Sequence, residues 1–109
     1  MTIKYDEFDL LELFQSEPES ITGNIDDGEL IYIYKDNTNF QVVFCLDVYQ
    51  QTITLSLTWN DSVVFTGDFY HVTNLKKEDN SLITYVEGVK RLKVNFYKQL
   101  GVEILDSYL

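Results

Sequence analysis

Hydrophobic and polar side chains alternate along most of the chain after residue 20, as they do in strands that bury one face. The clearest case is residues 52–59, whose inward positions are Ile53, Leu55, Leu57 and Trp59. Residues 40–48 alternate in the same way, and the link at residues 49–51 predicts that the two segments pair as a hairpin. We expect this hairpin to form the centre of a sheet.

Shorter apolar segments predict the other strands, at residues 30–34, 63–65, 69–73, 82–86, 89–97 and 102–105. The pairs Asn60-Asp61 and Glu87-Gly88 and the triplet Asp26-Asp27-Gly28 are turn sequences. Gly67-Asp68 permits a bend or bulge, and the polar residues 76–80 predict a loop. Strands do not alternate with long helices, so the pattern favours antiparallel pairing.

The first residues follow a helical period instead. Residues 6–14 predict a short amphipathic helix that ends before Pro18. Four apolar side chains share one arc at 100° per residue: Phe8, Leu10, Leu11 and Phe14. The opposite arc carries Asp6, Asp9 and Glu12. The separation is incomplete, because Glu7 interrupts the apolar arc and Tyr5 and Leu13 lie on the acidic one.

A chain of 109 residues with 45% apolar side chains suits one compact domain. The predicted fold class is α+β and β-dominated, with an antiparallel sheet or sandwich of about seven or eight strands and one short N-terminal helix. Within the single domain 1–109, we expect an acidic helical segment at 1–19 and an antiparallel β region at 20–109.

Negative charge is concentrated near the N-terminus. The net charge is −10, and residues 1–29 hold nine carboxylates against one lysine. Such a charge disfavours direct binding to nucleic acid or to an anionic membrane, and it favours either a solvated face or a surface for a basic partner. The candidate partner-binding residues lie on the helix and at the first turn: Asp6, Asp9, Glu12, Asp26, Asp27 and Glu29.

Residues suited to catalysis or metal binding are sparse. His71 is the one histidine, and Asp68, three residues earlier in a predicted strand, should point to the opposite face. Cys45 lies between Phe44 and Leu46, so we expect a buried side chain rather than a nucleophile. Nucleotide-binding, hydrolase and calcium-loop motifs are missing. We therefore predict a protein that is not an enzyme and needs no cofactor or metal.

The cellular compartment follows from similar observations. One cysteine cannot form an internal disulfide framework, and the N-terminus lacks the basic and apolar regions of a signal peptide. Apolar runs are far shorter than the roughly 20 residues that cross a bilayer. We expect a cytoplasmic protein without membrane contact.

Several segments together resemble a known class of protein. These are DGEL leading into LIYIYKD, the paired FQVVFCLDV and TITLSLTW, then VVFTGDFYHVTNL and VKRLKVNFYKQLGVEI. Their layout over residues 20–105 is similar to that of small β-rich immunity proteins of bacterial polymorphic-toxin and contact-dependent growth inhibition systems. The resemblance implies a protein that binds a cognate toxin domain, often a nuclease, and blocks its active site or a neighbouring surface. The acidic charge agrees, because a nuclease carries a basic groove.

Three other interpretations remain open. The main alternative is a β-sandwich or barrel that holds a small ligand in a pocket lined by Trp59 and tyrosines. A nucleic-acid mimic and a homo-oligomeric structural domain are the others. Strand order and oligomeric state do not follow from the sequence.

Overall fold

The strands form two antiparallel sheets, and within each sheet every strand pairs with the strand next to it in the sequence. The computed structural model describes residues 1–97 and 100–105. In these residues one helix, α1 (Glu7–Phe14), precedes a 3₁₀ turn, η1 (Ile25–Asp27). The first sheet contains β1 (Glu19–Ser20), β2 (Glu29–Lys35), β3 (Phe40–Asp47), β4 (Thr52–Trp59) and β5 (Ser62–Phe69). The second sheet contains β6 (Val72–Glu78), β7 (Ser81–Val86), β8 (Val89–Asn95) and β9 (Gly101–Ile104).

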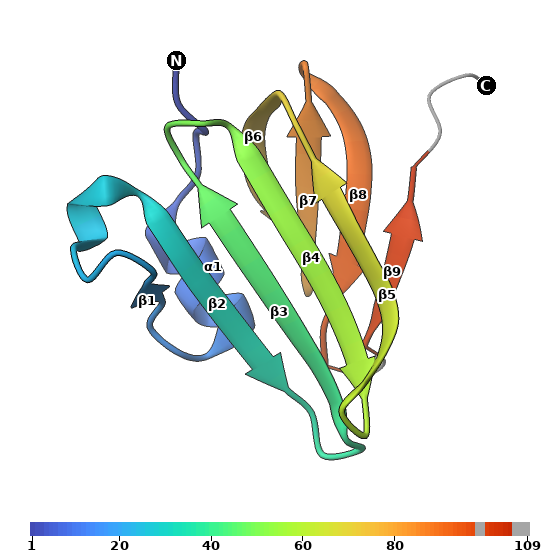
Figure 1. Cartoon of the computed structure of the whole chain (residues 1–109). Coiled ribbons are helices and arrows are strands. Elements are labelled where there is room, and N and C mark those ends of the chain that lie inside the picture. Colours follow the sequence, from blue (N-terminus) through green and yellow to red (C-terminus); the bar gives the residue numbers. More distant parts are fainter. Residues whose placement is uncertain (98–99, 106–109) are drawn as a thin grey trace.

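The two sheets form layers around one core. In Figure 1 the five-stranded sheet lies in front, and α1 lies behind it beside the four-stranded sheet. Fully buried side chains come from the helix and from both sheets, among them Leu10, Leu13, Phe44, Leu55, Leu82 and Leu92. Burial of this apolar surface is the main favourable contribution to folding.

The predicted fold class is confirmed: strands dominate, pairing is antiparallel and one helix comes first. The described residues form nine strands rather than seven or eight, and the extra one is the two-residue β1. The clearest prediction, residues 52–59, coincides with β4. Both residues of the predicted turn at Asn60-Asp61 have positive φ, as do both residues of the Glu87-Gly88 turn.

Three local predictions are wrong. Residues 69–73 do not form one strand, because β5 ends at Phe69, β6 begins at Val72, and His71 between them has a φ of 58°. Gly67-Asp68 forms neither a bend nor a bulge, because β5 continues from Ser62 to Phe69 and the register shift in its pairing with β4 lies elsewhere, between Leu57 and Thr58. Gly67 fits that strand because a Cβ there would lie only 3.3 Å from the rings of Phe65 and Phe69. Residues 76–78, expected in a loop, belong to β6, since their backbone pairs with β7 while Lys76 and Glu78 point to solvent.

The inward face of α1 also differs from the prediction. Leu10, Leu13 and Phe14 are buried, whereas Phe8 is 78% exposed and Leu11 is 37% exposed. The three buried residues follow the i, i+3, i+4 spacing of a helical stripe. The buried face of the helix is therefore rotated relative to the predicted arc. The shift leaves Phe8 and Leu11 on the surface.

Candidate functional site

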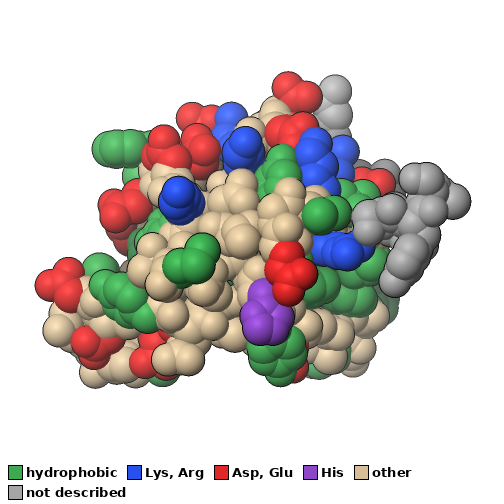
Figure 2. Space-filling model, turned by 90° about the horizontal axis from the view of Figure 1, so that it is seen from above, with side chains coloured by type: hydrophobic (Ala, Val, Ile, Leu, Met, Phe, Trp, Pro, Cys, Tyr) green, Lys and Arg blue, Asp and Glu red, His purple; other side chains and the backbone are tan. Residues whose placement is uncertain are grey.

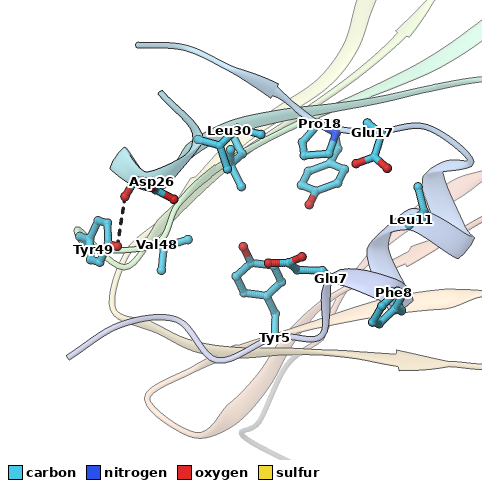
Figure 3. Close-up of a pocket in the computed structure, with 13 residues that line it drawn as sticks. Tyr5, Glu7, Phe8, Leu11, Glu17, Pro18, Asp26, Leu30, Val48 and Tyr49 are labelled. Carbon is cyan, nitrogen blue, oxygen red and sulfur yellow. Dashed lines mark hydrogen bonds between the residues drawn. The ribbon is translucent and has the colours of Figure 1, made fainter. Parts of the chain in front are cut away.

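A cavity of about 330 Å³ opens between α1, η1 and the adjoining ends of β2 and β3 (Figure 3). We call it the acidic cavity. Its lining comes from four segments of the chain: Tyr5, Glu7, Phe8, Leu11, Glu17, Pro18, Ile25, Asp26, Gly28, Leu30, Tyr32, Val48 and Tyr49.

Backbone hydrogen bonds fix the segment that carries Tyr5. The amide of Ile3 donates to the carbonyl of Val48 at 3.0 Å, and the amide of Lys4 donates to the carbonyl of Thr73 at 3.0 Å. The segment therefore bridges the two sheets before α1 begins, and it places Tyr5 at the cavity wall (Figure 3). Asp6 then caps the helix, since its Oδ1 accepts from the amide of Phe8 at 2.8 Å.

Gly28 shapes the opposite wall. Its φ of 74° is in the left-handed region, and a Cβ there would lie 2.9 Å from Cε2 of Tyr49. The missing side chain lets the Tyr49 ring lie against the turn, where its hydroxyl donates to the carbonyl of Asp26 at 3.2 Å. Glycine at this position thus defines the shape of the cavity.

Tyr32 forms the buried part of the cavity. The residue is only 2% exposed, and its ring lies 5.2 Å from that of Phe14, centroid to centroid. Burial raises the pKa of its phenol far above the ordinary value, and the charges of Glu7 and Glu17 act in the same direction. Burial and Glu7 likewise raise the pKa of Tyr5.

The charged residues that line the cavity are acidic. Among residues 1–97 and 100–105, three carboxylates line it and no lysine or arginine does. Figure 3 shows Glu7 and Glu17 at the end nearest α1, while Asp26 lies with Tyr49 at the far end. Carboxylates beside aromatic rings attract a cation, through charge and through the ring faces.

The six residues predicted from charge fall into two groups. Asp6 caps α1, and Asp9 and Glu12 lie on it. Asp6 and Asp9 line a shallow hollow with Lys4 and Lys76, and Glu12 forms an ion pair with Lys77. Figure 2 shows acidic and basic side chains interspersed on one face of the molecule.

Asp26, Asp27 and Glu29 form the other group, at η1 and the start of β2. Of the six residues, only Asp26 lines the acidic cavity. Asp27 accepts a hydrogen bond from Oγ1 of Thr22 at 2.7 Å, and Glu29 is half-buried in the strand. Their role in binding a partner stays a prediction.

Sequence reasoning missed most of the cavity. Glu7, Glu17 and the tyrosines 5, 32 and 49 were not among the candidate residues. One signal was present, because Glu7 interrupts the apolar arc of the helix, and a carboxylate in such a position indicates a solvent-facing site.

The residues considered for catalysis lie outside the acidic cavity. His71 is exposed, and Asp68 accepts from Oγ1 of Thr54 at 2.8 Å. Cys45 is half-buried rather than buried, and desolvation raises the pKa of its thiol, which disfavours a thiolate nucleophile. Among residues 1–97 and 100–105, no three His, Cys, Asp or Glu side chains form a group that could hold a metal ion.

Trp59 does not belong to the cavity. It shares the predicted face of β4, but it lies at the end of the strand and is 46% exposed. Its Nε1 donates to the carbonyl of Thr38 at 3.2 Å. The expected pocket of Trp59 and tyrosines is therefore wrong for Trp59, while three tyrosines do line a cavity.

Comparison with known proteins gives one informative likeness. No protein-family model and no curated protein matches the chain. Among solved structures, the chain is similar to a chain of a contact-dependent growth inhibition toxin–immunity protein complex from Klebsiella pneumoniae 342, with a TM-score of 0.77. The match covers 94% of this chain and 96% of that chain, at 17% identity. It confirms the predicted resemblance at the level of the fold.

The described part of the chain contains no helix that is both long and apolar enough to cross a membrane.

Proposed function

We propose that this chain is an immunity protein that binds a cognate toxin domain and blocks its activity without catalysing a reaction. The observation that carries the proposal is the fold likeness to a chain of a contact-dependent growth inhibition toxin–immunity protein complex, which extends over nearly the whole of both chains. The acidic cavity supports it, because the cavity combines charge and aromatic surface in one place.

The partner that fits this charge is a basic toxin domain, and we propose a nuclease that acts in the cytoplasm. Nucleases bind phosphates through lysine and arginine side chains. A chain with net charge −10 attracts such a protein over long range, and carboxylates at the interface take the place of the phosphates.

The binding surface that we propose surrounds the acidic cavity. Four of its lining residues expose large apolar side chains: Phe8, Leu11, Ile25 and Tyr49. Exposed apolar groups next to carboxylates are typical of interface anchors within a polar rim. The same surface carries Glu17 and Asp26, so apolar contacts and charged contacts with the toxin would form together.

Co-expression tests the proposal. If a neighbouring gene encodes a large secreted protein, the C-terminal domain of that protein is the toxin candidate, and it is produced from an inducible promoter with and without this chain. We expect rescue of growth, a complex that co-purifies and inhibition of RNA or DNA cleavage by the purified toxin. Growth arrest that persists despite abundant folded chain would contradict the proposal.

A charge-reversal pair locates the surface. Glu17→Lys, at the cavity, should weaken the complex strongly. Glu87→Lys changes the net charge equally in the exposed turn between β7 and β8, and should weaken it little. An equal loss of affinity for the toxin in both variants would show that binding depends on net charge rather than on the surface around the cavity.

A further inference from the structure

We propose that the acidic cavity receives one arginine side chain of the partner protein, with the guanidinium group held by Glu7 and Glu17. The inference rests on the proposed function, because it names the chemical group that the partner presents to this surface.

No described basic residue neutralises the two glutamates of the cavity. Among the described residues, Glu7 and Glu17 have no ion pair, and their side chains accept no hydrogen bond. Elsewhere the chain does pair its acidic groups, as Glu78 and Lys90 show with an Nζ–Oε2 distance of 3.1 Å. Negative charge at the cavity is thus available to a cation from outside.

Tyr32 gives a second, independent indication of a ligand. Its side chain is almost completely buried and lines the cavity, yet its hydroxyl has no hydrogen-bond partner among residues 1–97 and 100–105. This oxygen is not sealed off from solvent, because Oγ1 of Thr84 is the one buried side-chain polar atom without a partner among the described residues, so the Tyr32 hydroxyl is open to a ligand from the cavity. A ligand that brings N–H donors into the cavity would satisfy the phenolic oxygen and the carboxylates together.

Arginine fits these groups better than other ligands do. A guanidinium is planar, carries five N–H donors and stacks on aromatic faces, and Tyr5, Phe8 and Tyr49 supply such faces. Lysine offers a more strongly hydrated point charge. The volume of about 330 Å³ lies at the lower limit of sites for whole small molecules, so it suits a single side chain.

The surroundings of the cavity suit the rest of the side chain. Leu11, Ile25 and Val48 are apolar lining residues that the methylene stem of an arginine could contact. Figure 3 shows Leu11 beside Phe8 at the α1 end of the cavity, near the two glutamates. The cavity therefore combines an apolar surface for the stem with carboxylates for the charged head.

A model compound tests the inference without the toxin. The ¹⁵N-labelled chain is titrated with N-acetyl-arginine N′-methylamide, and with the citrulline analogue, which has nearly the same shape but no charge. We expect millimolar binding of the arginine compound, with amide shifts centred on Gly28, Tyr32 and Tyr49, and at least tenfold weaker binding of the citrulline compound. Equal binding of both, or shifts that avoid the cavity, would overturn the inference. Stronger binding of the lysine analogue would also overturn it.

Variants link the binding to the named carboxylates. Glu7→Gln with Glu17→Gln should abolish the arginine-dependent shifts, and Tyr32→Phe should weaken them severalfold. The matched control is Asp61→Asn with Glu87→Gln, which removes the same charge from two exposed turns. Thermal melting of each variant confirms folding, and arginine shifts that survive the Glu7/Glu17 change would contradict the assignment.

The toxin assay separates this inference from the proposed function. Full neutralisation with unchanged affinity by the Glu7/Glu17 variant would refute the arginine site while leaving the immunity function intact. Arginine binding at the cavity in a chain that binds no toxin would refute the function and support the site.

Discussion

Glu12 on α1 forms an ion pair with Lys77 on β6, and the distance between Oε1 and Nζ is 2.6 Å. The hydrogen bond to Glu12 raises the pKa of Lys77. The pair connects the helix to the second sheet at the surface, and it offsets one of the carboxylates that the sequence suggested for partner binding. Acidic residues of this chain therefore differ in how much charge they can offer a partner.

The ion pair leads to a prediction about affinity. Glu12→Gln should change the affinity for the toxin domain less than about threefold, whereas Glu17→Gln should lower it about tenfold, which corresponds to about 1.4 kcal/mol. The reason is that Glu17 lies at the cavity and has no ion-pair partner in the described part of the chain. Calorimetry at low and high salt measures both changes, and a larger loss for Glu12 would place the interface on the other face of α1.

Phe8 should separate binding from stability. Because its side chain is 78% exposed, Phe8→Ser should change the free energy of unfolding by less than about 0.5 kcal/mol. The same change should weaken toxin binding by about 2 kcal/mol if the ring anchors the interface.

The control for Phe8 is Leu10→Ala in the same helix. Leu10 is buried, so this change should cost about 2 to 5 kcal/mol of stability. Urea denaturation and titration with the toxin measure the two quantities, and strong destabilisation by Phe8→Ser would argue against the observed orientation of α1.

Tyr97 should hold the helix end in place. Its hydroxyl lies 2.6 Å from the carbonyl oxygen of Glu12 and 2.7 Å from that of Leu13, so it donates its proton to one of two carbonyls at the last turn. Tyr97→Phe should lower the free energy of unfolding by about 0.5 to 1.5 kcal/mol. Chemical denaturation tests this, and an unchanged midpoint would show that water replaces the bond at no cost.

Stability should fall at high pH because of Tyr32. Burial raises the pKa of its phenol in the folded state above the ordinary value of 10.0, so the unfolded chain loses this proton first. The contribution is fully present below pH 10 and is lost as the pH rises from there toward the folded pKa. Tyr32→Phe should lessen the slope of unfolding free energy above pH 10, and an identical slope would contradict the burial of this phenol.

The sheets could largely be predicted from the sequence, because local rules determine them. Alternation with a period of two places Ile53, Leu55 and Leu57 on one face wherever the strand pairs, and Asn60-Asp61 suits the positive φ angles of a tight turn. The continuous β5 could not be predicted in this way, because Gly67 is compatible with a bend as well as with a crowded strand.

The face of α1 depends on tertiary packing. Its eight residues offer two overlapping apolar stripes that share Leu10 and Phe14, and the core accepts the stripe with Leu13, which is completely buried, while Phe14 contacts Tyr32, Phe44 and Phe96. Sequence periodicity alone ranks Phe8 and Leu11 as equally good core residues.

The acidic cavity could not be predicted for a similar reason. Tyr5, Tyr32 and Tyr49 are far apart in the sequence and meet only through strand register, the Gly28 turn and the docking of the N-terminal segment. The composition shows eight tyrosines and eighteen carboxylates, but it does not show where in the fold they come together.

The most direct test is neutralisation of the candidate toxin domain that is identified by co-expression with this chain. Purified chain, added in equal amount, should form a complex and suppress nuclease activity, and the Glu17→Lys variant should do so only at much higher concentration. A toxin domain that stays fully active and unbound in the presence of excess folded chain would contradict the proposed function.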